Sequence, residues 1–167
     1  QPEDINVIVE ASLFLAKGQM KSKNIEVVSE LSKDLPKVIV DKNKIEQVFI
    51  NLLLNAVQAM QDHGKIFVRS YPKNLDALGK GVGKRSEDFF SLGEKAAIVE
   101  IEDTGCGIAE ENLKKIFEPF FTTKAAGQGT GLGLSITKDI IILHRGIIDV
   151  TSQIGKGTKF TIILKIA

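Results

Sequence analysis

The chain has 167 residues, of which 43% are hydrophobic and 26% are charged, and its formal net charge is +1. This length suits one domain with a hydrophobic core of its own. Nucleic-acid-binding proteins usually carry an excess of basic residues, and this chain does not. The net charge therefore argues against nucleic acid as the main ligand.

Cys106 is the single cysteine, so neither an internal disulfide nor a cysteine-based metal cluster is possible. A reducing compartment, the cytoplasm, is the simpler location. We interpret Cys106 as a small buried residue, with a redox-sensitive thiol as the alternative. No apolar run approaches the ~20 residues of a membrane span, and residues 1–4 do not resemble a signal peptide. We expect a soluble fragment without direct membrane insertion, cut from a longer protein that is either free or membrane-attached.

The first half of the chain predicts two amphipathic helices separated by extended segments. Apolar residues recur at helical spacing over 4–17, with Asp4 as the N-cap and Gly18 as the stop. Residues 23–31 and 38–40 read as strands. A second and more regular helix follows over 42–61.

The second helix carries Asn51, Asn55 and Gln58 on one face, because they are four and three residues apart. Asparagine is a poor residue for a helix interior, since its amide competes for backbone hydrogen bonds. Two interpretations stay open at this point. Either the amides cap a neighbouring loop, or they face a polar ligand such as Mg²⁺ that carries nucleotide phosphates.

The middle of the chain predicts two strands, 65–71 and 96–102, joined by a long surface loop over 72–94. The Phe89–Phe90 pair in this loop is interpreted as packing onto the core, with a docking spot for a partner as the alternative. Asp103 ends the second strand at the edge of the core. Its carboxylate would accept a hydrogen bond from the amino group of adenine, bind a metal or cap the next helix, and the residue alone does not decide between them.

The last third predicts a short helix over 109–116, a helix over 135–144 and strands over 147–151 and 158–166. Three phenylalanines within 117–121 are expected to anchor a loop in the core. The small, polar residues 122–130 are typical of a mobile lid, in which Lys124 is the only cation. Closely spaced glycines over 129–133 precede a helix and favour an anion there, although the patterns of a Rossmann fold and of a P-loop are both missing.

Five segments together carry a specific resemblance: NLLLNAVQAM (51–60), DTGCGI (103–108), FEPFFTTK (117–124), GQGTGLGLS (127–135) and GKGTKFTIILK (155–165). In this order and spacing they resemble the N, G1, F and G2 boxes and the closing strand of the catalytic ATP-binding domain of bacterial sensor histidine kinases. The resemblance covers nearly the whole chain. It implies a single domain over 1–167 with an α/β two-layer sandwich fold: a mixed sheet of about five strands, three main helices on one face and an ATP lid.

The resemblance also implies the roles of individual residues. Asn55 would bind Mg²⁺, Asn51 would contact phosphate or metal-bound water, and Lys124 would meet the phosphates, so these three would be catalytic. Asp103 would bind the adenine amino group. The full set implied for nucleotide binding is Asn51, Asn55, Gln58, Asp103, Gly105, Gly107, Ile108, Thr123, Lys124, Gly129, Thr130, Gly131, Leu132, Gly133, Leu134 and Thr158.

The function implied is transfer of the γ-phosphoryl group of Mg-ATP to a histidine on an adjoining or partner helical domain, and from there to an aspartate of a response regulator. That helical hairpin would lie upstream of residue 1 and would make the intact protein a homodimer. Neither His63 nor His144 has the sequence context of the phosphorylated histidine. The alternatives are a protein serine kinase, an ATPase and a docking module that only senses ATP.

Asn51 bears on the mechanism, and two other positions depart from the family pattern. An amide stands at Asn51 where hydrolytic relatives have a glutamate that activates water, which predicts slow hydrolysis. Gln58 stands where many members have a lysine near phosphate. Arg145 replaces the first glycine of the commoner His-Gly-Gly turn.

Overall fold

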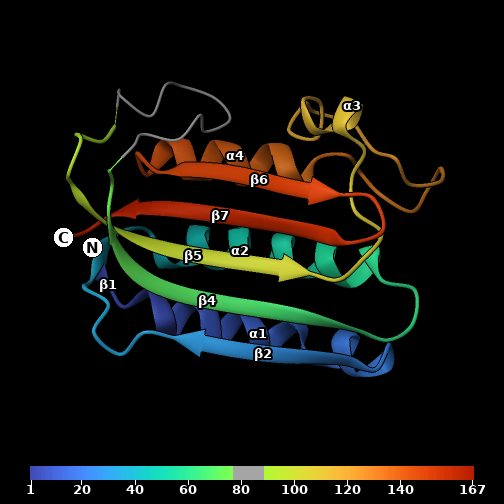
Figure 1. Cartoon of the computed structure of the whole chain (residues 1–167), viewed down its shortest axis with the longest axis horizontal. Coiled ribbons are helices and arrows are strands. Elements are labelled where there is room, and N and C mark those ends of the chain that lie inside the picture. The colour runs from blue at the N-terminus through green and yellow to red at the C-terminus, as the bar shows by residue number, and fades with distance from the viewer. Residues whose placement is uncertain (77–88) are drawn as a thin grey trace.

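The structure is a computed structural model that describes residues 1–76 and 89–167. Its main feature is a five-stranded sheet in the order β2–β4–β5–β7–β6 (Figure 1). The strands are β2 (Ile25–Leu31), β4 (Gly64–Asn74), β5 (Lys95–Asp103), β6 (Ile147–Gln153) and β7 (Gly157–Lys165). β2 runs parallel to β4, and the other neighbouring pairs are antiparallel. The mixed five-stranded sheet that the resemblance implied is therefore confirmed.

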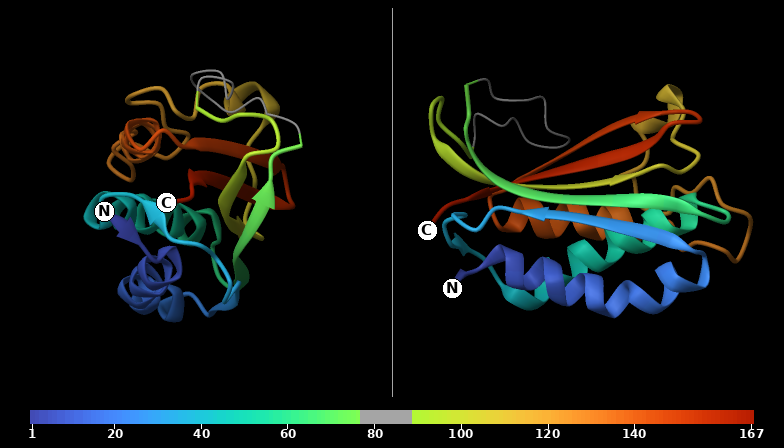
Figure 2. Two further views of the ribbon diagram at one scale, coloured as in Figure 1. Left: turned by 90° about the vertical axis from the view of Figure 1, so that its left-hand side faces the viewer. Right: turned by 60° about the horizontal axis from the view of Figure 1, so that its bottom comes forward.

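Three helices cover one face of this sheet, as the two further views show (Figure 2). They are α1 (Ile5–Ser22), α2 (Lys42–Ala59) and α4 (Gly133–Leu143), and a one-turn helix, α3 (Glu110–Leu113), precedes the last of them. The predicted helix over 109–116 is thus shorter than expected. The two-layer arrangement with three main helices on a single face agrees with the expected fold class.

The long helices begin where the sequence predicted. The Asp4 carboxylate accepts a hydrogen bond from the backbone N–H of Asn6 at 2.9 Å, and that of Asp41 accepts one from Lys44 at 3.1 Å. Each bond satisfies a backbone donor that the first helical turn leaves free. The prediction that Gly18 ends the first helix is wrong. Helix α1 continues to Ser22 because Met20, which is 3% exposed, still packs into the core.

Helix α2 lies between the other two and supplies much of the core. Its buried residues are Ile45, Val48, Phe49, Leu52, Leu53, Ala56 and Val57. They pack with apolar residues of α1, α4 and the inner strands in one continuous cluster. A helix fixed in this way on its apolar side has a fixed rotation about its axis, so the direction of its polar residues is fixed as well.

A small second sheet joins the N-terminus to the segment before α2. β1 (Pro2–Glu3) pairs antiparallel with β3 (Val38–Ile39). The sequence predicted β3 but not β1, which is too short to show a periodic pattern. None of the helices in residues 1–76 and 89–167 is both long and apolar enough to cross a membrane.

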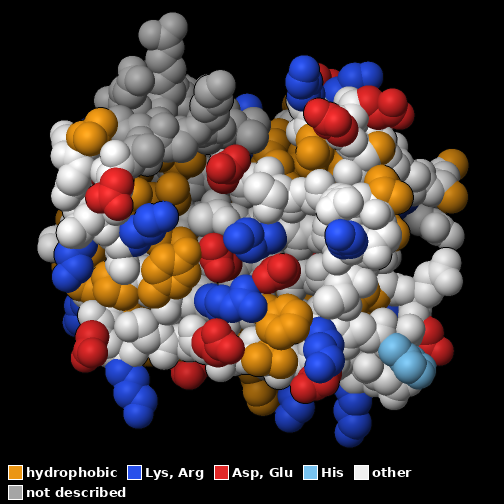
Figure 3. All heavy atoms as spheres, viewed as in Figure 1, with side chains coloured by type: hydrophobic (Ala, Val, Ile, Leu, Met, Phe, Trp, Pro, Cys, Tyr) orange, Lys and Arg blue, Asp and Glu red, His pale blue; other side chains and the backbone are white. Residues whose placement is uncertain are grey.

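The face of the sheet without helices is polar over much of its area (Figure 3). Arg69 of β4 lies 2.7 Å from Glu102 and 3.4 Å from Glu30, and Lys159 lies 3.5 Å from Glu100. An antiparallel arrangement commonly leaves one face in contact with water, and these ion pairs suit that position.

Part of the open face is covered by the ends of the connection between β4 and β5. Leu75 and Phe90 are buried there in a second, smaller apolar cluster, so Phe90 packs onto the fold as predicted. The predicted loop over 72–94 is too long at its start, because β4 extends to Asn74 and pairs with Lys95. Residues 77–88 of that predicted loop lie outside the described residues.

Candidate functional site

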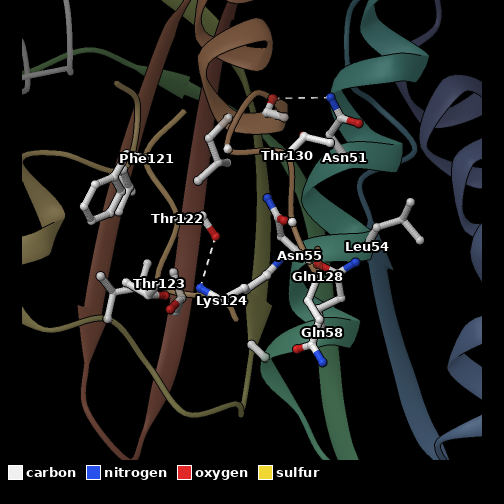
Figure 4. A pocket seen from close by; sticks show the side chains of 18 of the residues that line it. Asn51, Leu54, Asn55, Gln58, Phe121, Thr122, Thr123, Lys124, Gln128 and Thr130 are labelled. Atoms are coloured by element: carbon white, nitrogen blue, oxygen red, sulfur yellow. Dashed lines mark hydrogen bonds between the residues drawn. The ribbon is translucent and has the colours of Figure 1, made fainter. Parts of the chain in front are cut away.

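A cavity of about 750 Å³ lies between α2 and residues 117–132, which we call the lid segment, where β5 ends and β7 begins (Figure 4). This volume is in the range of small-molecule sites. Of the residues predicted for nucleotide binding, the cavity wall contains Asn51, Asn55, Gln58, Asp103, Gly107, Ile108, Thr123, Lys124, Gly129, Thr130, Gly131, Gly133, Leu134 and Thr158. Segments up to 107 residues apart in sequence thus meet around one cavity.

Two predicted residues do not line the cavity. Gly105 lies against the last turn of α2, where an added Cβ would meet the Cβ and the carbonyl oxygen of Ala59 at 2.7 Å each. Leu132 precedes the first residue of α4. Both position parts of the wall without forming it.

The wall also contains residues that the sequence reasoning did not select. They are Leu54, Ala59, Cys106, Ile116, Phe121, Thr122, Gly127, Gln128 and Phe160. Leu54 is adjacent to Asn55, and Phe160 is two residues after Thr158. Their position beside motif residues could have indicated that they line the cavity. The interpretation of Cys106 as a buried residue is wrong: its side chain is exposed at the cavity wall.

Asp103 is the most deeply buried charged residue of the cavity wall, at 5% exposed. Its Oδ1 atom accepts hydrogen bonds from the backbone N–H groups of Gly105 at 2.8 Å and Thr158 at 3.3 Å. Burial raises the pKa of Asp103 above its ordinary value, while the two backbone hydrogen bonds act in the opposite direction. Within the described residues, Oδ2 accepts no hydrogen bond, so this carboxylate retains one oxygen for a ligand.

The hydroxyl groups beside Asp103 form a connected network. Ser152 Oγ lies 2.8 Å from Thr158 Oγ1, donates to the carbonyl oxygen of Gly157 at 2.9 Å and accepts the backbone N–H of Ile108 at 2.8 Å. Thr158 is 5% exposed and faces the cavity. This network joins β6, β7 and the loop after β5, and thereby fixes the floor of the cavity around Asp103.

The glycine at 107 has a structural explanation. Its backbone φ is +75°, a conformation that residues with a side chain rarely adopt. An added Cβ would also lie 2.2 Å from the carbonyl oxygen of Gln153. The loop after β5 can therefore approach β6 closely only with glycine here. Crowding by protein atoms, rather than by a ligand, accounts for this residue.

The two asparagines of α2 differ in their surroundings. Asn51 Nδ2 donates to the carbonyl oxygen of Gly133 at 3.3 Å and lies 3.5 Å from Thr137 Oγ1, so it joins α2 to the first turn of α4. The Asn55 amide makes no hydrogen bond with any other residue that the structure describes, although it lies in the cavity wall. The sequence left two interpretations open, in which the amides either contact a neighbouring element or face a polar ligand. Asn51 fits the first interpretation, and the Asn55 amide is free for the second.

The N-terminus of α4 also favours the binding of an anion in the cavity. Helix α4 has no side-chain N-cap, and Gly133 and Leu134 of its first turn lie in the cavity wall. Backbone N–H groups in a first helical turn have no partner within the helix, and together with the helix dipole they favour negative charge.

The lid segment is anchored at one end by aromatic residues. Phe117 is 5% exposed and packs edge-on against Phe160 with ring centroids 6.3 Å apart. Phe121 packs partly buried against the core. The prediction that all three phenylalanines anchor the loop is wrong for Phe120, which is 75% exposed and has a φ of +65°.

Lys124 is the cation of the cavity wall. Its ammonium group donates a hydrogen bond to the Oε1 atom of Gln58 on α2, and its backbone N–H donates to Thr122 Oγ1 at 3.1 Å. Partial burial lowers the pKa of Lys124. The cation therefore lies between the lid segment and α2, on the side of the cavity that carries Asn55.

The residues present fit a magnesium ion that arrives with nucleotide phosphates. Asn55 offers an uncommitted amide oxygen, a hard ligand of the type that Mg²⁺ accepts while it keeps phosphate and water oxygens. No group of three or more histidine, cysteine, aspartate or glutamate side chains suited to a metal occurs in the described chain.

The histidines lie away from this constellation. The His63 side chain is 75% exposed after the end of α2, with a backbone φ of +70°. His144 ends α4, where its Nε2 accepts the backbone N–H of Asp41 at 3.0 Å. His63 is therefore a surface residue, and His144 is a helix-terminal residue.

Comparison with known proteins gives a consistent result. Residues 40–167 match the family model described as histidine kinase-, DNA gyrase B-, and HSP90-like ATPase. The chain is 38% identical over 166 residues to the signal transduction histidine-protein kinase AtoS of Escherichia coli K12, covering 99% of this chain and 24% of that protein. The chain therefore spans about a quarter of the length of this relative.

Solved structures agree with this match. The catalytic domain of the histidine kinase ThkA, in a nucleotide-free form, superposes with a TM-score of 0.76 at 30% identity, covering 99% of this chain and 95% of that one. The structure of ThkA in complex with the response regulator protein TrrA superposes with a TM-score of 0.72 at 27% identity, covering 100% of this chain and 42% of that one.

Proposed function

Because the chain belongs to the histidine kinase-, DNA gyrase B- and HSP90-like ATPase family and has the fold of histidine-kinase catalytic domains, we propose that it binds Mg-ATP and transfers the γ-phosphoryl group to a histidine. The acceptor histidine lies on an adjoining or partner helical domain of the intact protein, which is a homodimer. A response regulator then takes the phosphoryl group onto an aspartate. The domain works in the cytoplasm.

The environment of Asp103 is the observation that carries this proposal. One carboxylate oxygen is held by the N–H groups of Gly105 and Thr158, and the other remains available at the cavity wall. An acceptor fixed in this way suits the exocyclic amino group of adenine, whereas guanine offers a carbonyl oxygen at the corresponding position. Adenine at Asp103 directs the phosphates along α2 toward the lid segment.

The groups around the other end of the cavity support the position of the phosphates. The N-terminus of α4 and the Lys124 ammonium both stabilise negative charge. Asn55 would hold Mg²⁺, which supplies charge neutralisation for the phosphate oxygens. Phosphoryl transfer relies mainly on such positioning and charge stabilisation, so no residue of the domain has to form a covalent intermediate.

The transfer step itself balances without a further reagent. The bond between the γ-phosphorus and the bridging oxygen breaks, a bond from an imidazole nitrogen of the acceptor histidine to that phosphorus forms, and ADP leaves. The imidazole loses its N–H proton to solvent. Asn51 does not activate water, because an amide is not a base at neutral pH and its N–H group is directed to α4. Transfer to the histidine is therefore faster than hydrolysis.

The proposal is tested with the domain joined to its native upstream segment. The protein is incubated with γ-labelled Mg-ATP, and the bound label is then exposed to acid and to alkali. A phosphoramidate on histidine is lost in acid and survives alkali, which is the expected result. Acid-stable label would identify a serine kinase, phosphate release without label an ATPase, and nucleotide binding alone a sensing module, and each of these outcomes would overturn histidine transfer.

A further inference from the structure

The lid segment is tied to the rest of the fold by one notable polar contact. Within the described chain, the hydrogen bonds made by residues 122–130 stay inside the lid segment, apart from the bond between Lys124 and Gln58. Figure 4 shows the Lys124 side chain extending from the lid segment toward α2. This bond therefore decides where the lysine ammonium lies before any ligand enters.

Gln58 is well placed to hold this ammonium. It follows Asn55 by three residues on α2, so the two side chains share a face of a helix whose rotation is fixed by its buried apolar side. A lysine at position 58, as in many members of the resembling family, would repel Lys124 instead of accepting a hydrogen bond from it. The Lys124 contact thus depends on the amide that this chain carries.

The chemistry of the pair also suits an anionic ligand. The amide oxygen of Gln58 is a neutral acceptor, so it holds the ammonium without cancelling its charge, which a carboxylate would do. An ammonium group has three N–H donors, and one bond to Gln58 leaves two for phosphate oxygens. Because burial lowers the pKa of Lys124, an acceptor beside it also favours the charged form.

We propose that Gln58 is a positioning residue for phosphate binding, which acts by holding the Lys124 ammonium at the α2 side of the cavity. The lysine is then in place when the phosphates of ATP arrive, and less side-chain freedom is lost on binding. This inference rests on the proposed function for the identity of the ligand. The contact itself is independent of that function.

The nucleotide test is a double-mutant cycle with Gln58→Met and Lys124→Met, both of which keep side-chain length. In the otherwise unchanged chain, Gln58→Met is expected to weaken Mg-ATP affinity about fivefold by calorimetry, equivalent to about 1 kcal/mol. In the Lys124→Met background it is expected to have no effect, because the group it positions is gone. Gln47→Met is the matched control, since Gln47 is exposed on the same helix and lies outside the cavity wall.

Two outcomes of this cycle would overturn the inference. An equal loss of affinity in both backgrounds would mean that Gln58 contacts the nucleotide directly. Unchanged or tighter binding by Gln58→Met would mean that the contact contributes nothing or obstructs the site.

A second measurement needs no nucleotide. Trypsin binds the ammonium group of the lysine after which it cleaves, so we expect the hydrogen bond to Gln58 to slow cleavage after Lys124. Gln58→Met is expected to speed cleavage after Lys124 several-fold without changing cleavage after Lys115, and Gln47→Met is expected to match the unmodified chain. An unchanged rate at Lys124 would overturn the inference, whereas failure of the unmodified chain to bind Mg-ATP would overturn the proposed function and leave this measurement interpretable.

Discussion

Replacing Asp103 by asparagine is expected to weaken ATP binding without lowering the stability of the free domain. If the asparagine oxygen keeps the hydrogen bonds from Gly105 and Thr158, its NH₂ group takes the place of the free carboxylate oxygen. The adenine amino group then meets a donor. The variant loses a hydrogen bond to a charged acceptor, worth roughly 1.5–3 kcal/mol, and leaves buried donors facing each other at a further cost of about 1–3 kcal/mol. A loss of about 3 kcal/mol corresponds to a roughly hundredfold weaker affinity for ATP.

The same substitution is not expected to lower the stability of the free domain. Burial raises the pKa of Asp103, so the stability that its protonated form contributes is complete below the unfolded pKa and is lost as pH rises through the native pKa. At neutral pH the ionised carboxylate therefore disfavours the fold. Asparagine removes that charge and keeps the acceptor, so the thermal midpoint should be equal or higher.

Calorimetry with ATP and thermal unfolding of the free domain check both expectations. The affinity ratio between the unmodified chain and Asp103→Asn, measured as the pH is lowered toward the raised pKa of Asp103, should fall toward one, because protonation removes the acceptor in the unmodified chain alone. Using the ratio cancels the titration of the nucleotide. Unchanged affinity in Asp103→Asn at neutral pH would refute the placement of adenine at this residue.

Three further substitutions test other parts of the fold and the site. Asn55→Ala should abolish Mg²⁺-dependent phosphoryl transfer and retain part of the nucleotide affinity, so full transfer activity would exclude its metal role. Asn51→Glu should raise the rate of phosphate release from ATP, because it adds a base where hydrolytic relatives have one; no gain would contradict the account of slow hydrolysis. Gly107→Ala should lower the free energy of unfolding by about 1–3 kcal/mol in urea titrations, since its φ is +75° and Gln153 O is too close, and an unchanged midpoint would show that the loop can move.

The sequence predicted the regular elements of the fold well where one pattern dominated. Helix α2 has a continuous apolar arc and an N-cap, and its bounds agree closely with the prediction. The predicted loop over 72–94 includes Pro72, and proline lacks the backbone donor that a central strand needs. In the structure β2 ends opposite Ser70, so at Pro72 β4 has a neighbour on one side only and the missing donor is tolerated. Whether Pro72 has a neighbouring strand on one side or on both depends on pairing with distant strands, so the local sequence cannot predict it.

The candidate site followed from motifs more than from local physics. Residue types and spacing placed the α2 amides on one face, and the resemblance joined them to Asp103 and to the glycines before α4. The bond between Gln58 and Lys124 could not be predicted, because it joins residues 66 positions apart through the path of the lid segment. The exposure of Cys106 escaped prediction for a similar reason, since it depends on how the loop after β5 meets the last turn of α2.

The pairing of Asn74 with Lys95 offers a practical route for engineering. These residues hold together the two ends of the connection between β4 and β5, at the end of β5 opposite Asp103. With a rise of about 3.3 Å per residue, the nine residues of β5 put Lys95, where that connection ends, about 25 Å along the strand from Asp103. Doubling the length of a closed loop costs only about 0.6 kcal/mol of chain entropy. A fluorescent reporter domain inserted between β4 and β5 would therefore be attached at the end of the sheet opposite Asp103.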